Sequence, residues 1–300
     1  MGRRATTTTT QDNTRAITDW IPTRGISAHK AWHGTIAKKP WEYKVTAVIP
    51  HLDTSELLDT NIALLRLQTE RPFIVIVDTG SSARHMGVLD ELERCNEDIE
   101  VHRLRFKSVV HPSDPVAVAM DLAFSACRTE WIYATHADCF LKNQHFIENT
   151  LEKMRVRDFS VAGYRITERK GVDTSKWVGH TATFFNTKFC DEHNLAWSQR
   201  KLCNLTGEDH AGDQKTSSYP DTEFLINVQL DVIAKDLKRP NRWIIGTEEN
   251  YITTDDEDIC HVRSYASSKL YSPEHFKKAS KSMERAMTEA YKRIKKWSDK

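Results

Sequence analysis

Short apolar runs alternate with helical patterns in the first half of the chain. Residues 45–50 and 73–78 are almost continuously apolar and are followed by polar residues, a pattern typical of strands buried on both faces of a parallel sheet. Between them, residues 54–69 place leucine and isoleucine at helical spacing behind a Thr-Ser pair, which predicts a helix that begins near Thr54. The alternation continues with helices predicted over 83–94 and 113–127, and strands over 99–104 and 130–138.

Strands and helices that alternate at this interval indicate an α/β domain with a mainly parallel sheet. Beyond residue 140 the pattern is less regular. There we expect two strands, a polar loop, an amphipathic helix, another strand, a closing loop and a last helix, over residues 158–166, 180–187, 198–220, 221–238, 242–248, 259–271 and 272–300. The last helix has an apolar stripe and many lysine and arginine residues around it.

Composition narrows the class of protein further. The 300 residues include 43 basic and 42 acidic side chains, for a net charge of +1, so overall charge does not favour nucleic-acid binding. No apolar run approaches the roughly 20 residues that span a bilayer, and the polar start lacks the apolar segment of a secretory signal. Six scattered cysteines are typical of reduced thiols. We therefore expect a soluble, cytoplasmic protein without a transmembrane segment.

Polar side chains follow three of the predicted strands, where ligands of open α/β sheets bind. They are His51 and Asp53 after the first strand, Asp78 with Gly80 and Ser81 after the second, and His136 and Asp138 after the fourth. A single Asp in such a place is more often a turn residue or a helix cap, but three such strand ends together favour a binding site. No G-x-G-x-x-G or P-loop motif is present, which disfavours a dinucleotide or P-loop site.

The segments VTAVIPHLD, PFIVIVDTGSS and AMDLAFSACRTEWIYATHAD resemble, in order and spacing, those of the GT-A glycosyltransferases of family 2. That family has a strand ending in Pro and polar residues, a helix closing on Gln-Thr, a strand ending in D-[DN]-G-S, and a D-x-D motif after a later strand. The resemblance covers roughly residues 45–190. It implies a GT-A, Rossmann-like α/β fold with a mostly parallel sheet flanked by helices.

In that family the D-x-D carboxylates and a divalent metal hold the diphosphate of a nucleotide-sugar. The resemblance therefore implies that Asp138 is a ligand of Mn²⁺ or Mg²⁺, or of a water bound to the metal. It implies that Asp78 recognises the base of a UDP- or GDP-sugar, aided by Gly80, which lets the backbone approach. The other residues implied in the nucleotide pocket are Pro50, His51, Asp53 and Ser81.

The sequence departs from the family at the first position of D-x-D, which is His136. A histidine there could bind ribose or phosphate, bind a softer ion such as Mn²⁺, or mark weakened metal dependence or lost activity. Some similar GT-A enzymes supply a late metal-binding histidine. His261 is the candidate here, and a surface or capping role is the alternative.

The catalytic base of inverting members is an Asp near the start of an amphipathic helix, where it takes the proton of the acceptor hydroxyl. Asp221 fits best, with Glu223 two residues later, and Glu208 and Asp209 are the rivals in the preceding loop. Asp221 could equally be a helix N-cap, and a retaining enzyme need use none of them. Trp177, Gly179 and His180 are candidates for the acceptor site.

We therefore predict transfer of a hexose from a UDP- or GDP-sugar to a hydroxyl of a glycan, lipid, metabolite or modified nucleobase. The alternatives are a degenerate, non-catalytic glycosyltransferase that acts as a scaffold, or a nucleotidyltransferase. The expected organisation is a flexible N-terminal arm (1–40), a GT-A domain (41–270) with nucleotide-sugar (41–140) and acceptor (141–270) halves, and a basic helix (271–300). That helix could contact an anionic surface or a second copy of the chain.

Overall fold

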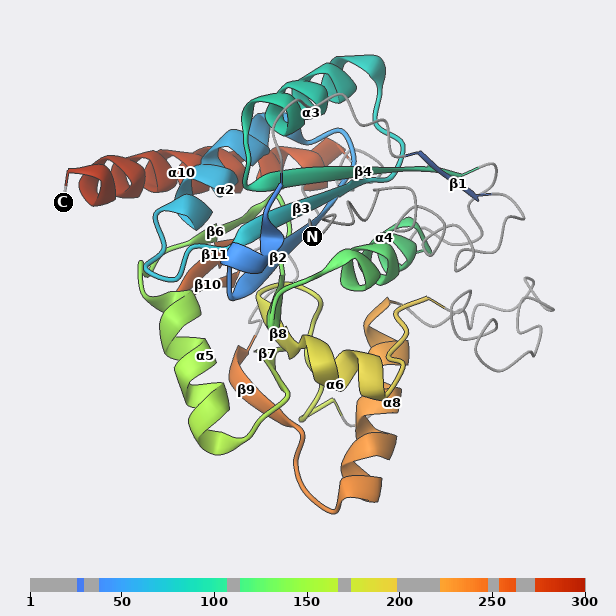
Figure 1. The fold of residues 1–300 in the computed structure, drawn as a ribbon. Helices are drawn as coiled ribbons and strands as arrows, with labels where there is room; N and C mark the ends of the chain where they lie inside the picture. The colour runs from blue at the N-terminus through green and yellow to red at the C-terminus, as the bar shows by residue number, and fades with distance from the viewer. Residues whose placement is uncertain are drawn as a thin grey trace, which may run out of the picture.

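The computed structural model describes residues 26–29, 38–106, 114–166, 174–198, 222–247, 254–262 and 273–299. Within these ranges the chain forms one large sheet with helices on both faces (Figure 1). The strands of this sheet, in spatial order, are β1 (Ile26–His29), β4 (Ile99–Phe106), β3 (Phe73–Asp78), β2 (Val45–His51), β5 (Trp131–Ala134), β8 (Thr183–Asn186), β7 (Val161–Arg165) and β9 (Arg242–Thr247).

The centre of the sheet is parallel. Strand β2 pairs in parallel with β3 on one side and with β5 on the other, and β3 pairs in parallel with β4. Strand β7 also pairs in parallel with β9, and antiparallel pairs join β1 to β4, β5 to β8 and β7 to β8. The predicted α/β class with a mostly parallel sheet is therefore confirmed.

Alternate residues of the central strands pack into two separate cores. Along β3, Ile74 and Ile76 face one core, while Val75 and Val77 face the other, as the two-residue period of a strand requires. The helices that contribute to the first core are α2 (Ser55–Arg66), α3 (Ala83–Cys95), α5 (Phe146–Arg157) and α10 (Pro273–Ser298). Those that contribute to the second are α4 (Asp114–Ala126), α6 (Thr187–Glu192) and α8 (Thr222–Leu237).

A second, antiparallel sheet was not expected from the sequence. Its strands are β10 (Thr254–Asp255), β11 (Ile259–His261) and β6 (Cys139–Leu141). The prediction of a closing loop from residue 259 was wrong at its start, because Ile259 to His261 pair with β6. Strands of two or three residues are too short to show a period in the sequence, and their stability comes from pairing and burial.

The described part of the N-terminal region, where a flexible arm was expected, contains a short strand. Strand β1 lies within residues 1–40 and extends the sheet at the edge of β4. A 3₁₀ turn, η1 (Pro40–Glu42), precedes β2. The other residues of the arm, up to residue 37, lie outside the described part of the chain.

In the described part of the chain, no helix combines the length and apolar character needed to cross a lipid bilayer. The longest, α10, carries charged residues along its whole length.

Gly163 in β7 shows how closely the sheet is packed. A methyl group at this position would overlap the side chain of Thr183 on the neighbouring strand β8, and Thr183 is buried with its hydroxyl bonded to the Gly179 carbonyl at 2.8 Å. We expect Gly163→Ala to lower the free energy of unfolding by about 1–3 kcal/mol, measured by chemical denaturation. Gly87→Ala is the matched control, because its methyl group would meet no atom within 4 Å. An unchanged denaturation midpoint for Gly163→Ala would contradict this expectation and show that β8 moves at Thr183 to make room for the methyl group.

Candidate functional site

The order of the strands creates a switch point between β2 and β5. Strands β3 and β4 follow β2 on one side, whereas β5 lies on its other side, with Val48 opposite Ala134. Helix α2, which leaves β2, packs into one core, and α4, which leads into β5, packs into the other. Ligands of open α/β sheets bind outside the carboxyl ends of strands at such a point. The predicted site residues follow β2, β3 and β5, so the fold gathers them there.

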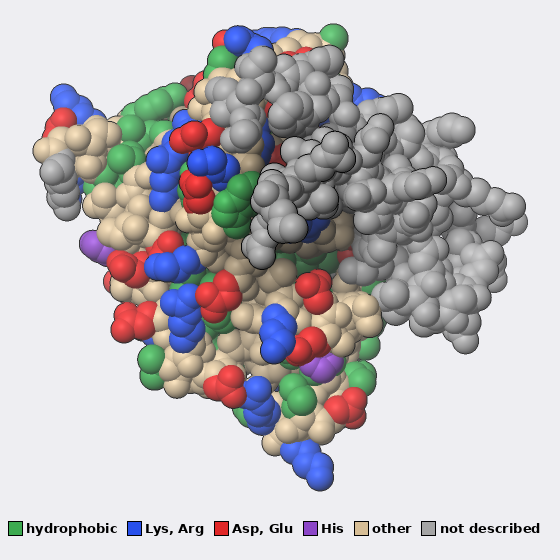
Figure 2. Space-filling view, viewed as in Figure 1, with side chains coloured by type: hydrophobic (Ala, Val, Ile, Leu, Met, Phe, Trp, Pro, Cys, Tyr) green, Lys and Arg blue, Asp and Glu red, His purple; other side chains and the backbone are tan. Residues whose placement is uncertain are grey.

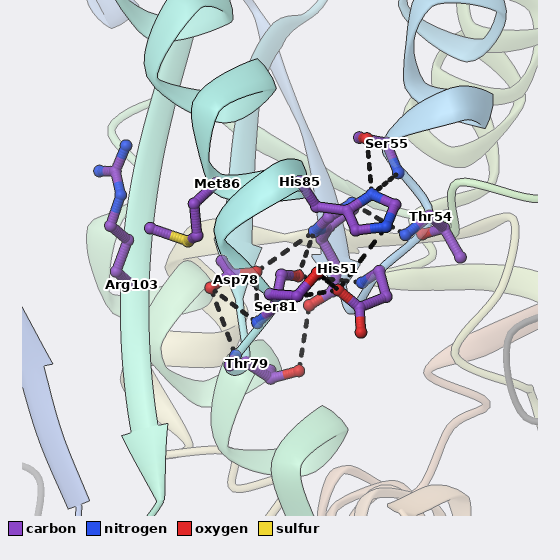
Figure 3. A network of polar contacts seen from close by, with 12 residues as sticks. His51, Thr54, Ser55, Asp78, Thr79, Ser81, His85, Met86 and Arg103 are labelled. Carbon is purple, nitrogen blue, oxygen red and sulfur yellow. Dashed lines mark hydrogen bonds and ion pairs between the residues drawn. The ribbon is translucent and has the colours of Figure 1, made fainter.

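His51 and Asp78 form a buried pair across the ends of β2 and β3 (Figure 3). Nδ1 of His51 lies 3.3 Å from Oδ1 of Asp78, and both side chains are fully buried. The backbone N–H of Thr54 donates to Nε2 of His51 at 3.3 Å. Because Nε2 accepts, Nδ1 carries the proton and donates to the carboxylate. This pairing fixes both the tautomer and the orientation of the ring.

The Asp78 carboxylate also holds the turn that follows β3. It accepts hydrogen bonds from the backbone N–H groups of Gly80 and Ser81 at 3.2–3.3 Å, and from Nη1 of Arg105 at 2.8 Å. Burial by itself would raise the pKa of Asp78, but the hydrogen bonds from His51, Ser81 and Arg105 outweigh it and hold the pKa well below its usual range. Gly80 has φ = +120°, a conformation that favours glycine.

Asp53 is the acidic side chain at this strand end that reaches solvent. Its backbone has φ = 50°, and its Oδ1 accepts from the N–H of Ser82 at 2.8 Å and from the Ser82 hydroxyl at 3.0 Å. Burial would raise the pKa of Asp53, but the bonds from Ser82 and nearby His85 lower it overall. Its side chain is 43% exposed. Asp53 therefore presents an anchored, ionised carboxylate at the surface.

The H-x-D motif lies in a turn directly after β5. The carbonyl of His136 accepts from the N–H of Cys139 at 3.1 Å and from Nδ2 of Asn61 at 3.1 Å. The same amide of Asn61 donates to the Cys139 carbonyl at 2.6 Å. Asn61 comes from α2, so the helix that leaves β2 holds the turn that leaves β5. This link couples the two edges of the switch point.

Strand β11 brings His261 to this turn. His261 is directly opposite Cys139 in the β6–β11 ladder, and the N–H of Val262 donates to the Asp138 carbonyl at 3.0 Å. As a result, Nε2 of His261 lies 3.5 Å from Oδ1 of Asp138. The ring of His136 lies 6.0 Å from that of His261. The structure thus brings together the three residues that the sequence nominated as metal ligands.

These residues fit a divalent ion in part. No group of three His, Cys, Asp or Glu side chains in the described ranges is arranged to hold a metal. Two atoms that bind the same metal, each roughly 2.1 Å from it, lie about 3–3.5 Å from each other. The separation of 3.5 Å between Asp138 and His261 matches this distance. Mg²⁺ usually takes one or two protein carboxylates and completes its shell with water and substrate phosphates. Asp138 supplies one such carboxylate, and the imidazole of His261 is a ligand better suited to Mn²⁺, so the two form a partial ligand set.

His180 and Glu223 adjoin the motif on the side of β8. The ring of His180 packs edge-to-face on that of His136 at 4.5 Å, and its Nδ1 lies 2.9 Å from Oε1 of Glu223. Glu223 is buried in the first turn of α8. Because β8 lies on the side of β5 away from β2, this pair is on the side opposite the pair of His51 and Asp78.

The other two acceptor-site candidates have structural contacts. Nε1 of Trp177, which is buried, donates to Asp231 at 3.1 Å. The N–H of Gly179 donates to the Tyr164 carbonyl at 2.9 Å. Both contacts fix the segment that positions His180.

The candidate bases Asp221, Asp209 and Glu208 lie outside the described residues.

Sequence reasoning missed the roles of Asn61, Ser82 and Arg105 in holding the site. Asn61 gives one usable signal, since it is a polar residue within the apolar face of α2 and is 2% exposed. A buried amide in such a position needs hydrogen-bond partners, and here they are the carbonyls of the H-x-D turn. Ser82 and Arg105 show no comparable signal, because both residue types are common at the surface.

Comparison with known proteins identifies the family of the chain. The model of the family described as glycosyl transferase family 2 matches residues 46–229. The chain belongs to that family. The match spans the switch point and the start of α8 and includes His51, Asp78, His136 and Asp138, whereas His261 lies beyond it. No curated protein matches the chain.

Distant likenesses to solved structures were also found. They include a Pyrobaculum calidifontis mannosyltransferase in complex with GDP-Man and Mn²⁺ (13% identity, 54% of this chain and 50% of that one, TM-score 0.39). A second is S. aureus TarS in complex with UDP-GlcNAc (14% identity, 52% of this chain and 48% of that one, TM-score 0.39). A third is Mycobacterium tuberculosis glucosyl-3-phosphoglycerate synthase in complex with Mn²⁺, UDP and glucosyl-3-phosphoglycerate (10% identity, 68% of this chain and 71% of that one, TM-score 0.42). The chain thus spans about half the length of the first two. Similarity at this level does not identify donor or acceptor.

Replacement of Asp78 by Asn tests the buried pair. Because the pKa of Asp78 is lowered on folding, its carboxylate stabilises the fold above the ordinary aspartate pKa of about 4, and this contribution is lost as the pH falls toward the lowered value. Asp78→Asn should cost about 1–3 kcal/mol of unfolding free energy at pH 7, and the gap to wild type should narrow between pH 4 and pH 2, followed by urea denaturation. Asp59→Asn, on the exposed side of α2, should change stability by less than about 0.5 kcal/mol. A gap that does not depend on pH would contradict this assignment.

Proposed function

We propose that the protein transfers a hexose from a UDP- or GDP-sugar to a hydroxyl acceptor with the help of Mn²⁺ or Mg²⁺. The observation that carries this proposal is the convergence of His136, Asp138 and His261 at the end of β5, beside the pair of His51 and Asp78. Family membership supports the reaction class. The geometry supports the placement of a nucleotide diphosphate between the two strand ends.

Asp138 and His261 would hold the metal, with His136 close enough to join them or to bind the diphosphate. A divalent ion held there would supply positive charge that stabilises the leaving diphosphate. The protein contributes the rigid placement of its donor atoms. The Asn61 amide and the β6–β11 ladder hold the two sides of this pair.

The nucleoside would lie against the ends of β2 and β3. His51 and Asp78 are buried and their polar atoms are bonded to each other and to the turn, so in our proposal they act mainly by fixing the residues that surround them. Asp53 and the backbone at Gly80 are the exposed groups there. This refines the expectation that Asp78 reads the base directly. Pro50 and Ser81 complete the same edge.

The acceptor would approach from the side of β8, where His180 lies between His136 and Glu223. Asp221 directly precedes Thr222, the first residue of α8, and Glu223 is anchored to His180. Asp221 is therefore our choice as the base that takes the acceptor proton, ahead of Asp209 and Glu208. The nucleotide half then corresponds to residues 41–140 and the acceptor half to 141–270. The acceptor itself is a glycan, lipid, metabolite or modified nucleobase.

Nucleotide binding tests the donor site. We expect UDP or GDP to bind in calorimetry with Mn²⁺ present and at least tenfold more weakly without it, because the ion neutralises the diphosphate. Asp138→Ala and His261→Ala should each lower the metal-dependent affinity by 10- to 100-fold. His193→Ala, at the end of α6, is the matched histidine control and should bind like wild type. Absence of binding under every condition would favour the degenerate scaffold instead.

Hydrolysis of the donor, with water as acceptor, tests the base. UDP-glucose and GDP-mannose are incubated with Mn²⁺ and the wild type, Asp221→Asn, Asp209→Asn or Glu208→Gln. We expect Asp221→Asn alone to lower the rate by about 10²–10⁴-fold, with UDP or GDP affinity unchanged. If Asp209→Asn or Glu208→Gln is the slow variant, the base lies in the loop before α8. Equal rates in all three would indicate a mechanism without any of these carboxylates.

A further inference from the structure

The two faces of α10 differ sharply in environment. One face is buried in the first core, through Ala279, Met283, Ala286, Ala290 and Trp297. This face packs on α2 and β6, and Figure 1 shows α10 alongside α2, on the far side of the sheet from α8. The helix is therefore a fixed part of the domain, and its apolar face is not available to insert elsewhere.

The outward face of α10 is strongly basic. Its exposed basic side chains are Lys277, Lys278, Lys281, Arg285, Lys292, Lys295 and Lys296. At 100° per residue they fall within a sector of about 100°, opposite the buried face. We call this set the basic face. Glu284 and Glu289 lie at the margins of the sector, and Glu274 and Asp299 lie near the two ends of the helix.

Positive charge is concentrated on this helix rather than spread over the chain. Residues 273–299 contain eight basic and four acidic residues, whereas the whole chain has a net charge of only +1. The rest of the chain is therefore net acidic. On the face of the molecule drawn in Figure 2, lysine and arginine are interspersed with aspartate and glutamate. Within the basic face, Lys292 is paired with Glu289 at 2.8 Å and Arg285 lies 4.0 Å from Asp255, so the excess of positive charge rests mainly on the five other lysines.

The shape of the basic face fits a flat, negatively charged partner. From Lys277 to Lys296 it extends about 29 Å along a straight helix, at 1.5 Å per residue. Only its outer side is available, because the helix is packed on α2, so a planar surface can meet all the charges at once. Tyr291 is 57% exposed beside the basic face, and tyrosine is favoured at membrane–water interfaces.

We propose that the basic face docks the protein on an anionic phospholipid surface by electrostatic attraction, without insertion of the helix. Each lysine or arginine near such a surface strengthens binding by about fivefold. Helix α10 contacts β6, which begins at the residue after Asp138, so docking would hold the H-x-D turn at a fixed distance from the lipid. Insofar as the proposed glycosyl transfer is correct, this favours an acceptor located at a membrane surface.

Vesicle co-sedimentation tests the docking without relying on activity. The full chain is mixed with phosphatidylcholine vesicles that contain 0 or 30% phosphatidylglycerol, at 50 and 300 mM NaCl. We expect binding only to the anionic vesicles, with a loss of at least tenfold at the higher salt because surface charges are screened. Simultaneous Lys281→Gln, Arg285→Gln and Lys292→Gln should weaken binding by about 100-fold. Glutamine preserves helix propensity, and circular dichroism checks the fold.

The matched control replaces three exposed lysines elsewhere, Lys176, Lys188 and Lys235, by glutamine. It should bind anionic vesicles within about twofold of wild type, allowing for weak long-range attraction. Equal loss in the control and in the α10 variant would overturn the proposal, as would failure of the wild type to bind. Binding to a 30-base-pair DNA duplex without binding to vesicles would also overturn it and assign the basic face to nucleic acid. Since no donor is needed, these outcomes are independent of the nucleotide titrations.

Discussion

The site depends on one buried interaction, the hydrogen bond between His51 and Asp78 across the ends of β2 and β3. An ionised carboxylate at full burial is costly unless it is compensated. Here His51, Arg105 and two backbone N–H groups compensate it. Because these donors come from β2, from β4 and from the turn after β3, the charge holds three segments in one arrangement. This arrangement also fixes the position of nearby exposed groups such as Asp53.

A second constraint joins the two sides of the switch point. Asn61 projects from α2 to the carbonyls of the H-x-D turn, so the helix that begins beside His51 also fixes the turn that carries Asp138. The β6–β11 ladder then adds His261 from a distant part of the chain. Helix α10 packs on α2 and β6 in the first core and so supports the elements that carry Asn61 and the H-x-D turn. Helices α2 and α10 and the β6–β11 ladder therefore hold the proposed donor site.

The sequence predicted the elements in which a helical or strand pattern continues over many residues, or in which an apolar run is unbroken. Strands β2 and β3, and the polar residues at their ends, follow directly from such runs. Strands β6 and β11 could not be predicted, because three residues show no period and their pairing joins segments far apart in the chain. The proximity of His261 to Asp138 depends on that pairing. For the same reason, the contact of His180 with His136 could not be read from local pattern.

His136 in place of a carboxylate changes the electrostatics of the proposed metal site. With Asp138 as its one carboxylate and His261 beside it, the set carries one negative charge fewer than a D-x-D pair would. Attraction for a hard ion such as Mg²⁺ decreases with each carboxylate removed, whereas imidazole nitrogen is a better ligand for transition metals than for Mg²⁺. The proposed donor set therefore favours Mn²⁺ over Mg²⁺. With one carboxylate fewer, the diphosphate must neutralise more of the metal's positive charge. The metal would therefore bind more tightly when the nucleotide is bound, and the nucleotide more tightly when the metal is bound.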